Sequence, residues 1–266
     1  MTQTQREDAR DRGVTLAIEA AGGVGPLARK LGISQPSVSG WSRVPADRVA
    51  AVETATGVAR ALLRPDLFEA ERSAATPDDL ATARTREYLL LATLLSKPPR
   101  QTLLDELAAV TGDATPLGLA HIQLAEAAQR ATEATAGREY FNLFVGVGRG
   151  ELLPYLSFYQ TGFLNERPLA RVRDDFARLG VERRQGVFEP EDHIATLLEV
   201  MSGLVGGSIP GGATQADAFF ERHLKPWALR LFADLAVAEG AGFYKSVAEL
   251  GTTWIEIETQ LLEFAA

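Results

Sequence analysis

The chain has 266 residues, of which 46% are hydrophobic and 23% charged, and its formal net charge is −8. These fractions are those of a globular protein, and they exclude general disorder and collagen-like repeats. Because the chain has no cysteine, disulfides, iron–sulfur clusters and thiol catalysis are excluded as well. With three histidines, a metal site would have to depend on carboxylates, and none is predicted. At about 150 residues per domain, the length predicts one large domain or two smaller ones.

The chain opens with the polar, charged segment MTQTQREDARDR, which does not have the pattern of a secretory signal. No stretch approaches the roughly 18 uninterrupted apolar residues of a membrane-spanning helix. We therefore expect a soluble, cytoplasmic protein without membrane insertion.

The charge is distributed unevenly along the chain. Residues 1–72 contain 10 Lys/Arg and 9 Asp/Glu, a net of +1, whereas the remainder contains 17 and 26, a net of −9. Such an asymmetry suggests different partners for the two parts. Residues 69–79 (EAERSAATPDD) are polar and have no periodic apolar face, which is typical of a linker. We predict a small domain over 1–70, a linker over 71–80 and a larger domain over 81–266.

The basic segment 14–45 predicts short helices separated by glycines. Gly32 permits the left-handed turn that ends one helix, and Ser34 is a natural N-cap for the next. This is the spacing of a helix-turn-helix, whose last helix fits the major groove of DNA. The residues predicted to meet phosphates or bases are Lys30, Gln35, Ser37, Ser39 and Arg43. The alternative is a three-helix packing module without a DNA contact.

The run GGVGPLARKLGISQPSVSGWSRVPADRVAAVETATG and the closing RPDLF at 64–68 resemble the YdaS/Cro-like repressor domains, over about residues 13–68. The resemblance implies a helix-turn-helix DNA binder that acts as a homodimer on a palindromic operator. The modest positive charge of this segment departs from that of many DNA-binding domains.

The larger domain is predicted to be all-α. Apolar residues recur there every three or four positions, as in the run Ile194, Leu197, Leu198, Met201, Leu204 and Val205. Helix breakers separate these runs, and no stretch shows the period-2 alternation of a strand. We expect a bundle of long amphipathic helices.

Three aromatic or acidic clusters stand out in this domain, at 139–159, 188–194 and 219–227. In the second, Pro190 suits a first helical position, and the acids beside it favour the positive end of the helix dipole. The alternative is that Glu189, Glu191 and Asp192 gather charge to bind an arginine-bearing ligand.

Two catalytic interpretations are weaker. Ser157, Asp192 and His193 offer the residue types of a hydrolase triad, but adjacent residues on a helix point about 100° apart and no nucleophile elbow surrounds Ser157. The glycine loop 146–150 lacks the ending of a phosphate-binding loop. We predict no catalytic residue, and hence not an enzyme; a nucleotide hydrolase is the least favoured alternative.

The ordered motifs EYFNLF, PYLSFYQTGFLNE, EPEDHI and FFERHLKPW resemble the TorD/DmsD/NarJ family of redox-enzyme maturation chaperones, over about residues 84–263. The resemblance implies an all-helical chaperone that binds the twin-arginine leader and the apo form of a molybdopterin-containing oxidoreductase before cofactor insertion and export. Some members bind guanine nucleotides weakly; no other cofactor is implied. The GFLNE and EPEDHIATLLEVM segments are most similar to chaperones of formate dehydrogenases.

The family's leader-binding positions carry over to Tyr155, Ser157, Tyr159, Glu189, Pro190, Asp192 and His193, with His223, Pro226 and Trp227 beside them. Leu156 departs from the acidic residue often found at that position. The chain is therefore predicted to be a maturation chaperone with a fused DNA-binding domain. The competing hypothesis is a transcriptional regulator whose chaperone-like domain senses the client enzyme.

Overall fold

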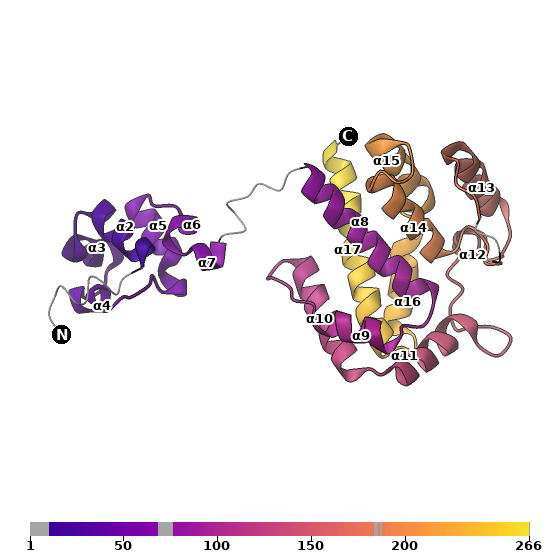
Figure 1. The fold of residues 1–266 in the computed structure, drawn as a ribbon, viewed down its shortest axis with the longest axis horizontal. Helices are drawn as coiled ribbons and strands as arrows, with labels where there is room; N and C mark the ends of the chain where they lie inside the picture. Colours follow the sequence, from indigo (N-terminus) through magenta and orange to yellow (C-terminus); the bar gives the residue numbers. More distant parts are fainter. Residues whose placement is uncertain (1–10, 69–76, 184–185, 187, 266) are drawn as a thin grey trace. The chain divides into compact units, whose positions relative to one another are not determined.

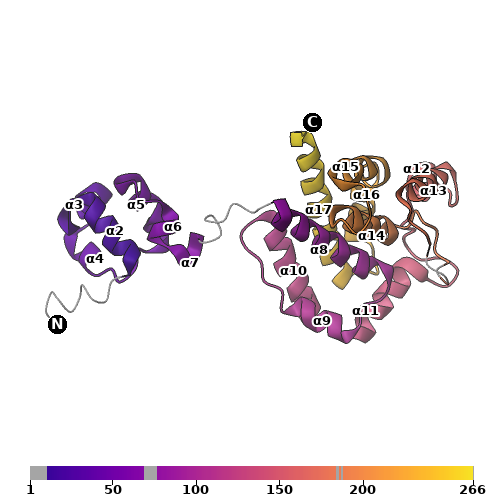
Figure 2. The same cartoon turned by 45° about the horizontal axis from the view of Figure 1, so that its top comes forward.

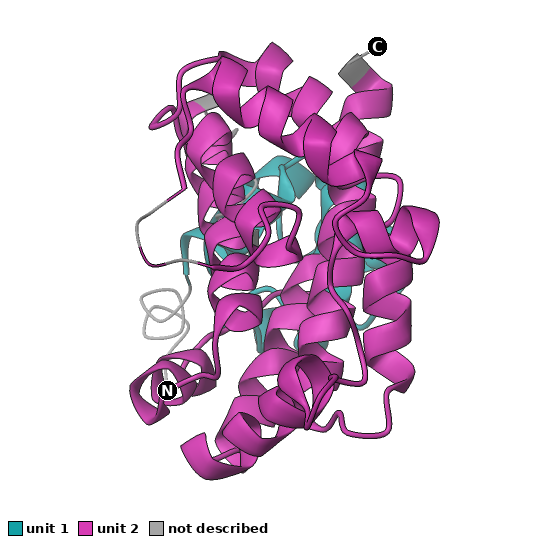
Figure 3. Ribbon diagram, turned by 90° about the vertical axis from the view of Figure 1, so that its right-hand side faces the viewer, with its two compact units in different colours: residues 1–76 teal, residues 77–266 magenta. Residues whose placement is uncertain are grey.

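The computed structural model describes residues 11–68, 77–183, 186 and 188–265. The chain divides into two compact units, residues 1–76 and 77–266, which Figure 3 distinguishes by colour. Every described element of either unit is a helix, and the one extended pairing among the described residues is an isolated antiparallel bridge between Tyr155 and His193. The predicted all-α fold class is confirmed.

Unit 1 is built from short helices. In chain order they are α2 (Arg12–Ala21), α3 (Val24–Leu31), α4 (Gln35–Ser39), the 3-10 turn η1 (Ala46–Arg48), α5 (Val49–Thr56), α6 (Arg60–Leu63) and α7 (Pro65–Phe68). The Asp11 carboxylate caps α2 by accepting from the Val14 amide at 3.0 Å. As predicted, the left-handed Gly32 ends α3, and the Ser34 hydroxyl caps α4 by accepting from the Ser37 amide.

One small core holds these helices together. It is formed mainly by Val14, Ala17, Leu27, Ala28, Val38, Val44, Val49, Val52 and Leu63. The close approach of α2 to α6 requires Gly13, because a Cβ on that residue would lie 2.0 Å from the Leu63 carbonyl oxygen. Any side chain at position 13 would push α6 away and open this core.

Unit 2 is a larger bundle. Its helices are α8 (Pro77–Ser96), α9 (Gln101–Ala108), α10 (Pro116–Arg130), α11 (Glu133–Tyr140), the π-helical η3 (Phe141–Val145), α12 (Leu156–Thr161), α13 (Arg167–Leu179), α14 (Ile194–Val205), α15 (Gly212–His223), α16 (Ala228–Val237) and α17 (Phe243–Ala265). The long helices pack in the pairs α8–α14, α16–α17 and α10–α17, and α12 contacts α13. Figures 1 and 2 show α8 and α17 side by side, with α12 and α13 at the edge of the bundle.

The core of unit 2 confirms the predicted apolar faces. The residues Ile194, Leu197, Leu198 and Met201 are buried, as are Phe219, Phe220 and Trp227. No helix in the described parts of the chain combines the length and apolar content needed to cross a bilayer.

The boundary between the units differs from the prediction at one end. The linker was expected over 71–80, but α8 already begins at Pro77. Proline fits the first turn of a helix, and Asp78 and Asp79 follow it at the positive end of the helix dipole. The polar residues that suggest a linker are therefore the opening turn of α8. The rest of the predicted linker, residues 69–76, lies outside the described residues.

Candidate functional site

The first two of the predicted leader-binding clusters, 139–159 and 188–194, meet where two chain segments cross. The Leu156 amide donates to the Asp192 carbonyl at 3.0 Å, and the Ile194 amide donates to the Pro154 carbonyl at 2.9 Å. These bonds bring Tyr155 beside His193, with ring centroids 5.2 Å apart in an edge-to-face arrangement. Residues more than 30 positions apart in sequence thus form one cluster.

Asp192 lies inside this crossing and is fully buried. Its Oδ2 accepts from the Ser157 amide at 2.8 Å, so the carboxylate caps the start of α12. Its Oδ1 and the Ser157 hydroxyl are both buried without a hydrogen-bond partner in the described structure. In this conformation neither group reaches a ligand at the surface, contrary to the arginine-binding role predicted for Asp192.

The helix expected to begin at Pro190 begins later, at Ile194. His193 is its N-cap, with Nδ1 accepting from the Ala195 amide at 3.2 Å. The prediction was wrong because the Asp192 carboxylate is used by Ser157, which keeps residues 190–192 in a turn. Burial lowers the pKa of His193 to about 4, against the opposing effect of Glu189 and Asp192.

The contacts of His193 and Ser157 also exclude the hydrolase triad in this conformation. The imidazole Nδ1 is occupied by a backbone amide rather than by Asp192. Asp192 bonds the amide of Ser157, not an imidazole, and the Ser157 hydroxyl contacts no base. The geometry of a nucleophile, base and orienting acid is absent from these three residues.

At the surface of the crossing, the Tyr155 hydroxyl donates a hydrogen bond to Glu189. Burial, the bond to Glu189 and the nearby negative charges raise the pKa of Tyr155 well above its usual value. The hydroxyl therefore stays protonated and acts as a donor at neutral pH. Glu189 itself is exposed, and Pro190 beside it is half-buried. Of the predicted acids, Glu189 is the one whose side chain faces solvent.

Glu191 is the third predicted acid, and two arginines of the chain hold it. Its Oε2 lies 2.9 Å from Arg173 Nε, and its Oε1 lies 2.7 Å from Arg183 Nη2. These guanidinium groups hold the pKa of Glu191 below its usual value, although burial opposes the shift. The carboxylate thus already binds a pair of arginines within the chain.

A cavity of about 240 Å³ opens beside Glu189 and Glu191. Its polar wall consists of Glu182, Glu189, Glu191 and Glu199 with Arg183, and its apolar wall of Phe176, Val181, Val200 and Ile209. Four carboxylates against one guanidinium give the lining a negative charge. Glu182 and Glu199 were not predicted as site residues from the sequence; Glu199 is the one charged residue of α14, which was a signal for it.

The remaining predicted residues form a second cluster around Trp227. The indole Nε1 donates to the His223 carbonyl at 2.7 Å, and the Tyr159 ring lies 5.1 Å from the Trp227 ring. The Tyr159 hydroxyl donates to Asp234 at 2.8 Å, while Pro226 is exposed in the turn before α16. Trp227 is 1% exposed, so it supports the fold and offers almost no surface.

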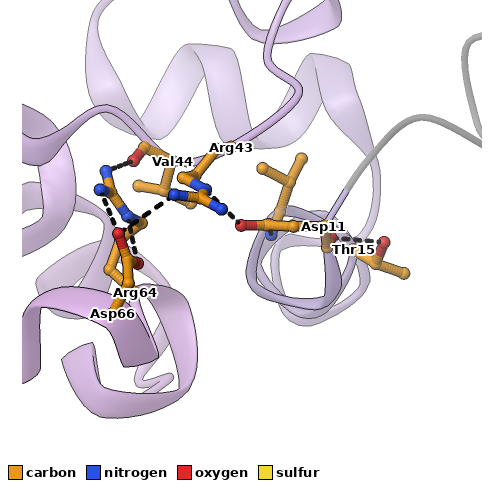
Figure 4. A network of polar contacts seen from close by, with 7 residues as sticks. Asp11, Thr15, Arg43, Val44, Arg64 and Asp66 are labelled. Atoms are coloured by element: carbon orange, nitrogen blue, oxygen red, sulfur yellow. Dashed lines mark hydrogen bonds and ion pairs between the residues drawn. The ribbon is translucent and has the colours of Figure 1, made fainter. Parts of the chain in front are cut away.

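In unit 1, the predicted DNA-facing residues have different surroundings. Gln35 and Ser37 are exposed on α4, whereas Ser39 is half-buried. The Lys30 ammonium donates to the Ala55 carbonyl at 3.2 Å, at the end of α5. Arg43 lies in a loop and takes part in a network of ion pairs that Figure 4 shows.

This network ties three parts of unit 1 together. Arg43 lies 3.4 Å from Asp11 and 3.1 Å from Asp66, and Arg64 binds Asp66 through two nitrogens, each at 2.8 Å. Arg64 also donates to the Val44 carbonyl at 2.7 Å. The bond from Arg64 lowers the pKa of Asp66 to about 2. The closing RPDLF motif therefore fastens the end of the unit to the loop that follows α4.

Comparisons with known proteins match both parts of the chain. Residues 111–233 match the family model described as nitrate reductase delta subunit, and residues 14–71 match the one described as bacterial toxin YdaS. Both resemblances inferred from the sequence motifs are confirmed by these matches.

The chain is also similar to curated relatives. The chain is 28% identical over 137 residues to the chaperone protein TorD of Vibrio atlanticus, and 30% identical over 135 residues to that of Vibrio cholerae. Each alignment covers 47% of this chain, and it covers 62% and 61% of the two relatives. A solved redox enzyme maturation protein from Archaeoglobus fulgidus superposes with a TM-score of 0.46 at 19% identity, over 65% of this chain and 93% of that one.

Proposed function

We propose that the chain recognises the twin-arginine leader of an apo-enzyme through unit 2, because unit 2 is similar to the TorD chaperones and matches the family model described as nitrate reductase delta subunit. Unit 1 matches the model described as bacterial toxin YdaS. The client would be a molybdopterin-containing oxidoreductase held in the cytoplasm until its cofactor is inserted. Formate dehydrogenase as that client, and weak guanine-nucleotide binding, stay predictions from the sequence motifs.

The observation that supports leader recognition is the acidic cavity beside Glu189. A leader presents paired arginines followed by an apolar stretch. Guanidinium groups bind carboxylates in charge-assisted hydrogen bonds, and apolar side chains gain free energy when they leave water. The cavity offers both surfaces within one opening, with glutamates on one wall and Phe176, Val181 and Val200 on the other. Glu189 is exposed at its edge, and the Tyr155 hydroxyl bonds to one of its two carboxylate oxygens, Oε1.

The test is a double-mutant cycle between this cavity and a labelled leader peptide. We expect Glu189→Gln in the full chain to weaken binding about tenfold, the effect of losing one charge-assisted hydrogen bond. Against a peptide whose arginine pair is replaced by glutamine, the same substitution should change almost nothing, because the two changes remove one shared interaction. Glu106→Gln, an exposed glutamate on α9 outside the cavity, is the matched control. Additive losses, or an unchanged affinity in Glu189→Gln, would contradict the proposal.

For unit 1 we propose DNA binding through α4. The match to the YdaS model and the exposure of Gln35 and Ser37 on a capped helix support this role. A homodimer would place two such helices on a palindromic site. Binding to DNA should be saturable and should weaken steeply with added salt. Binding to DNA that does not depend on salt, or the absence of binding to DNA, would contradict this proposal.

The competing hypothesis, a regulator that senses its client, makes a different prediction for the two units together. If leader peptide changes operator affinity by some factor, operator DNA must change leader affinity by the same factor. Titrating labelled operator with and without saturating leader, and then reversing the roles, measures both factors. Identical curves in both directions would identify the fusion as tethering without regulation.

A further inference from the structure

A second cavity in unit 2 lies between α13 and α15 and has a different chemistry. Its volume is about 330 Å³. Residues 211, 215, 218, 219 and 222 line it from one stripe of α15 and the residue before it, and residues 175, 178 and 179 line it from α13. The spacing of three and four positions on both helices identifies it as a groove between two helix faces.

Charge in this groove is centred on one carboxylate. Asp175 is 6% exposed, and its Oδ1 lies 2.9 Å from Arg178 Nη2. Its Oδ2 lies 2.5 Å from Arg222 Nη1 and 2.6 Å from His223 Nε2. Both guanidinium groups are thus held close together, at the two oxygens of the same acid.

The arginines carry more charge than this acid neutralises. Among the described residues that line the groove, Asp175 is the one acid, against the two cations Arg178 and Arg222. Burial lowers the pKa of His223, so that this histidine adds no charge at neutral pH. The lining is therefore positive by about one unit. Each guanidinium has five N–H donors, which exceeds what one shared carboxylate can accept.

The arginines are also accessible, unlike the acid they bind. The side chain of Arg178 is 67% exposed and that of Arg222 is 47% exposed. Asp175 fixes one edge of each guanidinium, which reduces the conformational entropy that a ligand would otherwise have to remove. The rest of the wall is apolar or uncharged and includes Leu179, Pro210 and Phe219.

We propose that this groove binds a small oxyanion that carries an apolar group, with the anion on Arg178 and Arg222 and the apolar group against Leu179 and Pro210. Phosphate and carboxylate share the geometry that a guanidinium recognises. The cavity of the proposed leader site has a negatively charged lining, whereas the lining of this groove is positive. A ligand of the groove therefore does not compete for Glu189. The inference does not depend on leader binding.

Isothermal titration of the full chain tests this proposal with three probes: inorganic phosphate, phenyl phosphate and phenylacetate. We expect saturable binding of phenyl phosphate, about tenfold tighter than inorganic phosphate because the ring leaves water. Phenylacetate distinguishes the two sources: binding comparable to that of phenyl phosphate assigns the groove to carboxylates, and weaker binding assigns it to phosphates.

The variants Arg178→Gln and Arg222→Gln should each weaken binding of the tighter-binding probe at least tenfold. Arg171→Gln, an exposed arginine on the same helix that does not line the groove, should leave binding unchanged. Because Arg222 contacts a buried acid, thermal unfolding of each variant confirms that the fold is retained, and Arg178→Gln carries the test if Arg222→Gln does not fold. The absence of saturable binding below about 10 mM for all three probes, or binding that both variants retain, would overturn the proposal.

Discussion

At the scale of single residues, neighbouring acids of one motif have different tasks. Glu189 is exposed, Glu191 is bound by Arg173 and Arg183, and Asp192 is fully buried against the Ser157 amide. All three looked equivalent as negative charges in sequence. Their surroundings separate a residue available to a ligand from residues that hold the fold.

This difference predicts opposite phenotypes for two substitutions. Asp192→Ala removes the acceptor of the buried Ser157 amide, so we expect it to lower the free energy of unfolding by about 1–3 kcal/mol. Glu189→Gln replaces an exposed side chain and should change stability by less than about 0.5 kcal/mol. Urea unfolding of unit 2, followed by far-UV circular dichroism, measures both. Equal stability of the two variants would show that the Asp192 bond contributes nothing to the fold.

The lowered pKa of His193 predicts that the stability of the fold depends on pH. Its pKa is about 4 in the fold, below the value of about 6.5 expected in the unfolded chain. Between these values the unfolded state binds more protons, so stability rises with pH there and is lost as pH falls from about 6.5 to 4. The full effect is on the order of 3 kcal/mol.

His193→Asn isolates this contribution. Asparagine can still cap α14 through its side-chain oxygen but does not titrate. Urea unfolding at pH 7 and pH 4.5 should show a smaller loss of stability for the variant than for the parent chain. His121, whose pKa the Glu87 carboxylate raises, acts in the opposite direction and is common to both proteins. The same pH slope in both would exclude His193 as a source of the dependence.

At the scale of elements, the short helix α4 depends on its neighbours for its place. Val38 is its buried anchor, and the network around Arg43, Arg64 and Asp66 holds the loop that follows it. Since Arg43 has two acidic partners, its substitution would disturb this loop as well as any phosphate contact. Arg29 on α3 is exposed. Its substitution separates the loss of a phosphate contact from a disturbance of the loop better than a substitution of Arg43 does.

Two substitutions should then distinguish phosphate from base contacts. Arg29→Ala should weaken binding to all DNA sequences and reduce the slope of log affinity against log salt by about one. Gln35→Ala should instead alter preference at one position of the site, by about 1–3 kcal/mol. Arg60→Ala, whose guanidinium pairs with Glu53 at 3.1 Å, is the control. Fluorescence anisotropy over a salt series provides the measurement. If Gln35→Ala lowered the affinity for all DNA sequences equally, Gln35 would contact the DNA backbone and not a base.

At the scale of the whole molecule, two units with separate cores share one chain. The cluster around Val14 and Leu27 in unit 1 and that around Leu197 and Trp227 in unit 2 share no member. Each core is complete without residues of the other. Each unit should therefore fold alone.

Limited proteolysis tests this independence. Trypsin should cut between residues 69 and 76, where the sequence contains Arg72, and leave a fragment that begins near Pro77. Mass spectrometry identifies the cut, and circular dichroism of the purified fragment should retain a helical spectrum. Early cleavage inside 190–260, within the core of unit 2, would contradict independent folding.

The sequence alone determined what depends on neighbours along the chain. The 3–4 periodicity of Leu197, Leu198 and Met201 predicts a buried helix face, because successive turns of a helix place these residues on one side. Gly32 and Ser34 predict the turn before α4 for the same local reason. The motifs also indicated both resemblances, which the matches to the two family models confirm.

Tertiary structure decided what depends on residues far apart in sequence. The burial of Asp192 follows from its bond to Ser157, 35 positions away, which also moved the start of α14 from Pro190 to Ile194. The ion pairs of Glu191 with Arg173 and of Asp175 with Arg222 likewise join segments of the chain that meet only in the folded unit. The burial of a charged residue and its ion-pair partners are set only when the chain folds. Packing therefore decided which acids of this protein face solvent and which ones are held by partners within the fold.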